Sequence, residues 1–183
     1  KSAGAAPASG AWSRTHDRVF LGGDFWANPM EDWRIADGGA ECRSLGGNRS
    51  IHSLTHQLTH PAKGFSMSVQ LSQLEVRGKD NGGGFRLGVR SELNEYRSNC
   101  FVQQGLNAGV ADGNLVLGPR TAQLAAGADP KLIALVLTGV GRGDEVVLTL
   151  EARTGERGAS LGKLSHTVPA ETLLGNVALV SGY

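Results

Sequence analysis

Apolar and polar residues alternate along two stretches of the chain. From Gly64 to Leu74 every second residue is apolar through most of the stretch, and the pattern returns between Phe85 and Arg90. Strict alternation is typical of an antiparallel strand with one buried face and one polar face. We therefore expect two strands whose core faces carry Phe65, Met67, Val69 and Leu71 in the first and Phe85, Leu87 and Val89 in the second.

Turn-forming residues separate these and other strands. Asp80-Asn81-Gly82 lies between the two alternating stretches and predicts a hairpin that joins them. Asp112-Gly113 predicts another hairpin, between Leu106–Val110 and Asn114–Leu117. Asn-Gly and Asp-Gly favour the tight turns of hairpins because both residues tolerate positive φ.

Further strands are expected at regular spacing along the chain. The apolar runs Leu132–Leu137 and Val146–Leu150 predict central strands joined through Gly139–Asp144, and Pro169–Leu174 is compatible with one helical turn. Shorter or weaker strands are expected at Val19–Leu21, Trp33–Ala36, Ala40–Arg43, Leu161–Val168 and Asn176–Val180. About a dozen strands without a long helix indicate an all-β sandwich or barrel.

The segment Ser50–His60 fits two secondary structures. Its histidines recur every fourth residue, as they would on one face of a helix, but β-branched Ile51, Thr55 and Thr59 favour a strand. In a strand, the three histidines, Leu54 and Leu58 would share one face.

Composition narrows the class of protein. The chain has 183 residues, 40% of them hydrophobic and 19% charged, which suits a single globular domain. The 27 glycines are spread along the chain, as many tight turns require. The net charge is +1 and the basic residues are scattered, so neither nucleic acid nor an anionic membrane is the expected partner. No apolar run approaches the roughly 20 residues that span a bilayer.

The N-terminal segment and the two cysteines are the features of the sequence that relate to cellular localisation. Residues 1–16 are expected to be a flexible segment ahead of a domain at 17–183. Lys1–Gly10 is rich in small residues and resembles the start of a mature exported protein, although an artificial chain boundary explains it equally well. Cys42 and Cys100 could pair in an oxidising compartment, or both could be unpaired buried thiols.

The order of short motifs along the chain resembles a known family. The motifs are Gly23-Asp24-Phe25, Asp32-Trp33-Arg34, Asp37–Glu41, Leu54–Leu58, Gly83–Gly88, Gly105–Val110 and Leu173–Val180. Together they resemble concanavalin A-like jelly rolls of the laminin G and lectin type. More narrowly, they resemble the module that precedes the catalytic domain in some PhoD-like alkaline phosphatases, a group of metallophosphoesterases.

The resemblance covers roughly Val19 to Val180 and implies a two-sheet antiparallel jelly-roll sandwich. Such modules usually close with one more strand after the Leu173–Val180 motif, whereas this sequence stops at Tyr183. The resemblance therefore implies a fragment that lacks a final strand and a downstream domain.

The residue patterns of two hydrolytic chemistries are absent from the sequence. Two-metal phosphoesterases need clustered Asp, His and Asn ligands, and neither Asp-x-His nor Gly-Asp-x-x-Asp occurs. Glucanases of this fold place carboxylates on one strand face, but Glu92 and Glu95 are three residues apart and would face opposite ways. A related family of 3-keto-glycoside hydrolases shares the jelly roll, so a glycoside-processing enzyme stays an alternative.

Two sets of residues could bind a metal. His52, His56 and His60 could meet one Zn²⁺ on a helix, but on a strand neighbours in this set lie about 13 Å apart, too far for one ion. Asp24, Asp80 and Asp112 are candidates for a structural Ca²⁺, and the alternative is that they only form turns.

Polar residues of the two alternating strands form the candidate ligand site. If the strands pair, Ser66, Ser68 and Gln70 lie beside Arg86 and Arg90. Tyr96, Arg97 and Asn99 follow them in the sequence. Guanidinium and amide groups on a flat face suit the hydroxyls of a glycan, and the alternative is a solvated sheet face. Trp33 is expected in the core, and Trp26 at an edge of the sandwich, where it could stack on a sugar.

The function expected from these observations and the resemblance is non-catalytic. The chain is interpreted as an accessory, carbohydrate-binding-like module of an exported bacterial protein, attached to a metallophosphoesterase. The alternatives are a glycoside-processing hydrolase of the same fold and a purely structural domain that packs on a catalytic partner.

Overall fold

The computed structural model describes residues 10–75, 81–90, 105–125 and 132–183. These residues form thirteen β-strands and three short 3-10 helices. None of their helices is long and apolar enough to cross a membrane. The strands are β1 (Phe25–Asn28), β2 (Trp33–Ala36), β3 (Gly39–Cys42), β4 (Arg49–Leu58), β5 (Phe65–Leu71), β6 (Gly82–Val89), β7 (Leu106–Ala111), β8 (Asn114–Leu117), β9 (Arg120–Gln123), β10 (Ile133–Arg142), β11 (Glu145–Arg153), β12 (Ser160–Pro169) and β13 (Gly175–Ser181). The 3-10 helices are η1 (Met30–Asp32), η2 (Pro61–Lys63) and η3 (Ala170–Leu173).

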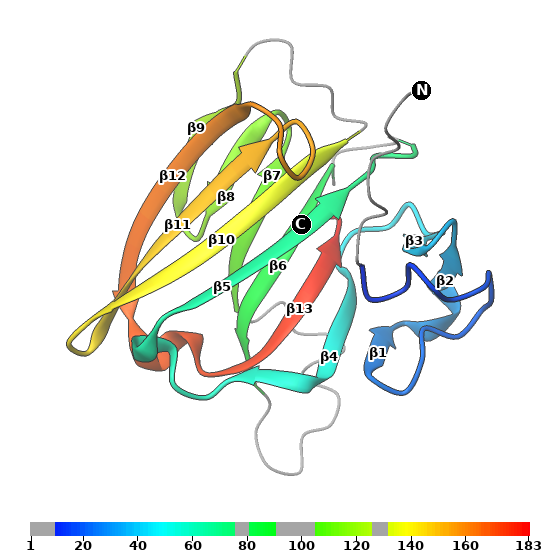
Figure 1. The fold of residues 1–183 in the computed structure, drawn as a ribbon, viewed down its shortest axis with the longest axis horizontal. Coiled ribbons are helices and arrows are strands. Elements are labelled where there is room, and N and C mark those ends of the chain that lie inside the picture. The colour runs from blue at the N-terminus through cyan, green and yellow to red at the C-terminus, as the bar shows by residue number, and fades with distance from the viewer. Residues whose placement is uncertain (1–9, 76–80, 91–104, 126–131) are drawn as a thin grey trace, which may run out of the picture.

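Two antiparallel sheets face each other and make the sandwich (Figure 1). One has seven strands in the order β1-β4-β13-β6-β7-β8-β9, and the other has four in the order β12-β11-β10-β5. A separate hairpin, β2-β3, lies beside β1 and β4. The predicted all-β jelly-roll sandwich is confirmed.

The main core lies between the two sheets. Leu135, Leu137, Leu148 and Leu150 from the four-stranded sheet are fully buried against Leu87 and its neighbours on the seven-stranded sheet. Alternation along β6 buries Phe85, Leu87 and Val89, as the sequence predicted. At about 1.5–3 kcal/mol for each large apolar side chain, this layer is the main source of stability.

The predicted hairpin between β5 and β6 is wrong. Strand β5 pairs with β10 in one sheet, and β6 pairs with β13 and β7 in the other. Gly82 begins β6 rather than completing a turn, and a Cβ atom there would clash with the carbonyl oxygen of Val110. The glycine that suggested a turn is thus required by close strand pairing.

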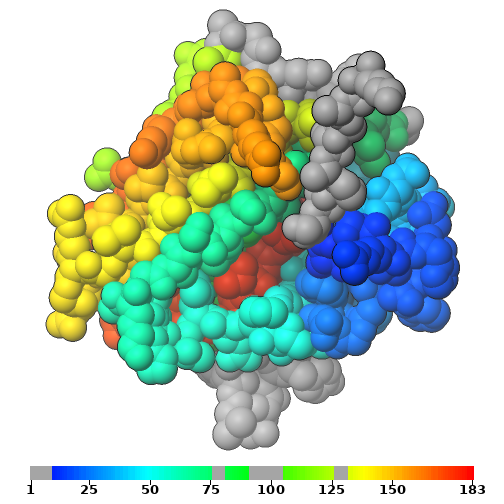
Figure 2. Space-filling model, viewed as in Figure 1, coloured from blue at the N-terminus to red at the C-terminus, as the bar shows by residue number. Residues whose placement is uncertain are grey.

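The core side chains of β5 are less buried than the sequence predicted. Phe65, Met67, Val69 and Leu71 pack against the core but stay half-buried, while the polar residues between them are exposed. Among the described strands, β5 pairs only with β10 and is an edge strand. Figure 2 shows β13 at the bottom of a hollow between β5 and strands β1 and β4. In the part of the chain that the structure describes, the second side of β5 therefore has no strand neighbour that would finish its burial.

Other turns match their sequence signals. Asp112 and Gly113 join β7 to β8 with φ of 47° and 77°, the positive values that such a turn needs. The turn that joins β10 to β11 is Gly143-Asp144, shorter than the predicted Gly139–Asp144 because Gly139–Arg142 pair with β11. The 3-10 helix η3 is the predicted helical turn before β13.

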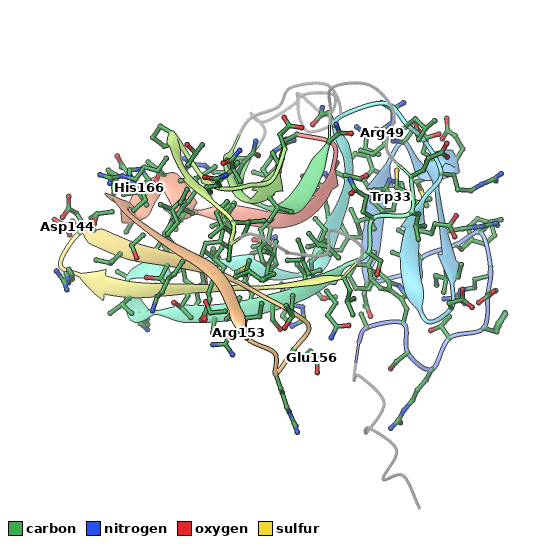
Figure 3. The ribbon with its side chains drawn as sticks, turned by 90° about the horizontal axis from the view of Figure 1, so that it is seen from above. Trp33, Arg49, Asp144, Arg153, Glu156 and His166 are labelled. Carbon is green, nitrogen blue, oxygen red and sulfur yellow. The ribbon has the colours of Figure 1, made fainter. Side chains whose placement is uncertain are left out.

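A smaller hydrophobic cluster joins the β2-β3 hairpin to the seven-stranded sheet. Its buried members are Leu21, Ala27, Trp33, Ile35 and Ile51. Figure 3 places Trp33 and Arg49 at the end of the molecule that carries β1 to β4, far from Asp144 in the β10-β11 turn. Trp33 is therefore a core residue, as expected.

The start of the described chain also packs on this cluster. Trp12 is half-buried, its indole N–H donates to the carbonyl oxygen of Leu21, and its ring contacts Phe25. The strand predicted at Val19–Leu21 is wrong: Arg18 makes one isolated bridge to Ile35, and Val19 is exposed. A local apolar triplet has no partner strand here, so only the bridge at Arg18 forms.

Strand β4 confirms the strand interpretation of the histidine segment, with an irregularity. His52 pairs with Ala178 on β13, but the next pair is Gln57 with Asn176. Four residues of β4, Ser53 to His56, thus oppose the single residue Val177 of β13, which makes a bulge in β4. His52 is buried whereas His56 is exposed, so the predicted common face of the histidines is wrong.

Candidate functional site

One row of side chains crosses the outer face of the seven-stranded sheet. Arg86 alternates with the core residues Phe85 and Leu87, so it points away from the core. The strand register places it in line with Trp26 on β1, His52 on β4, Ala178 on β13 and Asn107 on β7. We call these five residues the polar row. It lies on the side of the molecule that faces away from the viewer in Figure 1.

Arg86, on β6, is held in the polar row by two side-chain hydrogen bonds. Its side chain is 5% exposed, Nε donates to Asn107 Oδ1 at 2.8 Å, and Nη1 donates to Asn48 Oδ1 at 2.6 Å. Asn48 stands on the loop before β4 with a φ of 59°, and its backbone N–H donates to the carbonyl oxygen of Gly182. Two asparagine side chains thus fix the plane of the guanidinium.

His52 and Ser50 form the buried polar part of β4. They are 3% and 4% exposed, and Ser50 Oγ lies 3.0 Å from His52 Nε2 in a hydrogen bond. Burial, together with the positive charge of Arg86, lowers the pKa of His52 to about 4. The imidazole is therefore neutral at neutral pH, and Arg86 carries the charge of the polar row.

Trp26 forms the aromatic end of the polar row. Its ring centroid lies 5.4 Å from that of His52 with the planes tilted by 42°. The side chain is half-buried, so part of the indole faces solvent. An exposed aromatic surface beside planar polar groups is the combination that binds sugars through stacking and hydrogen bonds.

Glycines next to the polar row make room for Tyr183. Gly84 and Gly109 pair across β6 and β7, and a Cβ at either position would collide with the Tyr183 hydroxyl. That hydroxyl donates to the carbonyl oxygen of Phe85, and its burial raises the pKa of the Tyr183 phenol. Tyr183 is therefore an uncharged side chain that packs beside the polar row.

The structure separates the residues that the sequence grouped into a site. Gln70 lies exposed on β5, on the outer face of the other sheet, and Arg90 lies exposed just beyond β6. Arg86 is buried rather than on a flat solvated face. Tyr96 and Arg97, like Asn99, lie outside the described residues. Of the predicted set, only Arg86 belongs to the polar row.

Several residues of the site were missed from the sequence. Asn107, Asn48 and Ser50 carry no motif, and Tyr183 was considered only as the end of the sequence. The alternation of β7 could have indicated Asn107, because Ala108 beside it faces the core. Asn48 could not be found this way, because it lies in a loop.

The predicted metal ligands do not come together. Asp24 precedes β1 and Asp112 lies in the β7-β8 turn, near opposite edges of the seven-stranded sheet, and Asp80 lies outside the described residues. His56 and His60 are exposed and hydrogen-bond to neighbouring threonines. Within the described residues, no three His, Cys, Asp or Glu side chains could hold one ion.

The described cysteine is a free thiol. Cys42, on β3, is half-buried, and its Sγ donates weakly to the carbonyl oxygen of Ser44 at 3.5 Å. Burial raises the pKa of this thiol. Cys100 lies outside the described residues.

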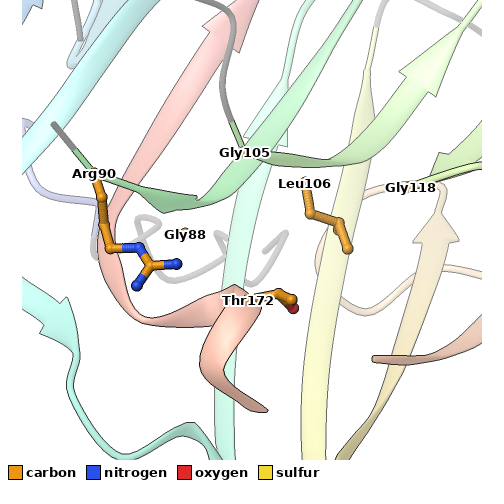
Figure 4. Close-up of a pocket in the computed structure, with 6 residues that line it drawn as sticks. All are labelled: Gly88, Arg90, Gly105, Leu106, Gly118 and Thr172. Atoms are coloured by element: carbon orange, nitrogen blue, oxygen red, sulfur yellow. The ribbon is translucent and has the colours of Figure 1, made fainter. Parts of the chain in front are cut away.

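An open depression of about 450 Å³ lies near η3 (Figure 4). Its lining residues are Gly88, Arg90, Gly105, Leu106, Gly118 and Thr172. Arg90 is the one charged residue among them, and it is exposed. The polar row has more convergent polar groups and is the stronger candidate.

Comparison with known proteins supports the fold. No protein-family model and no curated protein matches the sequence. Among solved structures, lectin II from Ulex europaeus superimposes with a TM-score of 0.53 at 11% identity, over 91% of this chain and 89% of the lectin. The lectin UEA-II complexed with galactose gives a TM-score of 0.52 at 12% identity, over 87% of this chain and 84% of the lectin. The fold is therefore the concanavalin A-like jelly roll of legume lectins.

Proposed function

We propose that this domain binds glycans through the polar row, without catalysing a reaction on them. The observation that carries the proposal is the register of Trp26, His52, Arg86 and Asn107 on one sheet face. Trp26 supplies a stacking surface, and Arg86 and Asn107 supply hydrogen-bonding groups held in fixed orientations. The galactose complex of a lectin with the same fold adds support.

The span of the polar row favours an oligosaccharide over a single sugar. Trp26 and Arg86 stand on strands three positions apart in the sheet. At about 4.8 Å between neighbouring strands, their backbones are roughly 14 Å apart. A ligand that contacts both side chains must therefore extend across the strands.

A glycan array followed by calorimetry tests the proposal. Trp26→Ala is expected to weaken binding of any captured glycan at least about tenfold, or about 1.4 kcal/mol. Gln70→Ala, on the other sheet, is the matched control and should leave affinity unchanged. If Gln70→Ala abolishes binding and Trp26→Ala does not, the site belongs to the surface suggested by the sequence. If no glycan binds, the structural role is favoured.

We further propose that the module is part of an exported metallophosphoesterase. This rests on the motif resemblance to PhoD-like proteins and on the small-residue composition of Lys1–Gly10. Reading the full gene tests it: a signal peptide upstream and a two-metal set of Asp, His and Asn ligands downstream are expected. A gene without the downstream ligand set would rule out this parent protein.

A further inference from the structure

The guanidinium of Arg86 has no carboxylate partner in the described part of the chain. The ion pairs there involve other arginines: Arg34 with Glu41, Arg49 with Asp32, and Arg153 with Glu151. The two hydrogen-bond acceptors of Arg86 are the neutral side chains of Asn107 and Asn48. Nη2 is buried and has no hydrogen-bond partner among the described residues. Within the described residues, this buried cation is thus held by neutral groups alone.

The unbalanced charge and the unpaired donor of Arg86 destabilise the fold unless an anionic group binds there. A buried charge without a counterion is strongly destabilising, and each buried donor left unpaired adds to that cost. The neutral imidazole of His52 adds no charge, and the Tyr183 phenol is neutral as well. The polar row therefore has one positive charge that no carboxylate of the described residues balances, and an anionic ligand would balance it.

The geometry of the guanidinium indicates the form of that partner. The Nη1 and Nη2 atoms form one edge of the guanidinium, which binds both oxygens of a carboxylate at once. In the structure, Asn48 Oδ1 accepts a hydrogen bond from Nη1, and Nη2 has no hydrogen-bond partner among the described residues. Asn48 is half-exposed and stands on a loop, so its side chain can be displaced without disturbing the sheet.

We propose that the glycan is acidic and that the carboxylate of a uronic acid unit binds the Nη1–Nη2 edge of Arg86 in place of the Asn48 amide. This inference rests on the proposed function of the polar row as a glycan site. Trp26, three strands away, stacks on a different unit of the same oligosaccharide. A neutral sugar offers only hydroxyl groups to Arg86 and leaves its charge unbalanced.

Calorimetry with a matched pair of ligands tests the inference. The probes are a trigalacturonate and its methyl ester, which keep the same sugar units and differ in the charge of the carboxyl groups and in one added methyl group on each of them. The acid is expected to bind at least about tenfold more tightly than the ester, which corresponds to about 1.4 kcal/mol. Arg86→Lys keeps the charge but loses the two-pronged contact, so the acid should bind it about tenfold more weakly.

Asn48→Gly tests the displacement directly. Glycine accepts the φ of 59° at this position, so the variant should fold normally while the Nη1 half of the edge is freed. Its affinity for the acid is expected to rise several-fold, and its affinity for the ester should not change. Weaker acid binding by Asn48→Gly would mean that Asn48 itself contacts the ligand, and the displacement would be wrong.

The outcomes separate the two proposals. If the ester and neutral galactose trisaccharides bind as tightly as the acid, and Trp26→Ala weakens all of them, the polar row is a glycan site but not an acidic one. If none of these ligands binds and the array captures nothing, the proposed function itself fails. The ligand comparison uses the unaltered protein, so it stands even if Arg86→Lys does not fold.

Discussion

The hydroxyl of Tyr183 donates a hydrogen bond to the carbonyl oxygen of Phe85 at 3.0 Å. The two residues are 98 positions apart in the sequence, and the bond ties the segment after β13 across the outer face of β6. It forms only because Gly84 and Gly109 leave space for the hydroxyl.

Filling that space should destabilise the domain. In Gly109→Ala, the new methyl group would clash with the carbonyl oxygen of Gly83 and with the Tyr183 hydroxyl. We expect the free energy of unfolding in urea to fall by about 1–3 kcal/mol, the usual cost of overpacking. Gly23→Ala is the control, because nothing lies within 4 Å of a Cβ there. An unfolding free energy equal to that of the control would show that Tyr183 does not occupy this space.

The buried imidazole of His52 should make stability depend on pH. Its pKa is lowered from 6.5 to about 4 in the folded state, so the unfolded chain binds the extra proton first as pH falls. The free energy of unfolding should therefore drop between about pH 6.5 and pH 4, by on the order of 3 kcal/mol from this group. Urea titrations of the wild type and His52→Gln across this range should give a shallower pH dependence for the variant. Parallel curves would mean that His52 is accessible to protons.

Because β5 is an edge strand, substitutions of its core side chains should destabilise the domain less than substitutions on a central strand. Leu135 and Val69 are paired across β10 and β5, but Leu135 is fully buried and Val69 is half-buried. Leu135→Ala should cost about 2–5 kcal/mol, and Val69→Ala clearly less, because its site is already open to solvent on one side. Chemical denaturation of both variants makes the comparison. Equal losses would place β5 in a fully covered position.

The Cys42 thiol should react slowly. Burial raises its pKa, which lowers the thiolate fraction at neutral pH, and the half-buried sulfur is partly shielded. In a Cys100→Ser background, labelling by a chromogenic disulfide reagent should be slower in the folded protein than in urea. Equal rates in both states would contradict the shielding seen on β3.

The sequence predicted where individual strands lie and which face they bury better than it predicted which strands pair with each other. Alternation placed Phe85 and Leu87 in the core because side-chain parity is a local property. Gln70 and Arg86 were wrongly joined, because the true partner of β5 is β10, more than 60 positions later, and a local Asn-Gly signal cannot report that pairing.

The candidate site was harder to predict than the strands, because its residues come together only through pairing between strands that are distant in the sequence. Arg86 could be picked out by parity, but its hydrogen-bond partners Asn48 and Asn107 reach it only after β6 pairs with β7 and the loop before β4 closes. His52 and His56 share parity in the sequence and differ in burial, because the irregularity in β4 lies between them.

Because the interior is divided into two hydrophobic clusters, we expect the domain to open in two cooperative units. The smaller one, around Trp33 and Ile35, is held by few buried side chains and includes Ile51 of β4. Hydrogen exchange of β2 and β3 should therefore occur through an opening that leaves the β10-β11 region protected. On β4, Ile51 and His52 point to opposite faces of the sheet. Each such opening would displace Trp26 at one end of the polar row while Arg86 stays in place. A substitution at Ile35 would therefore lower the affinity for the proposed glycan, although Ile35 does not contact it.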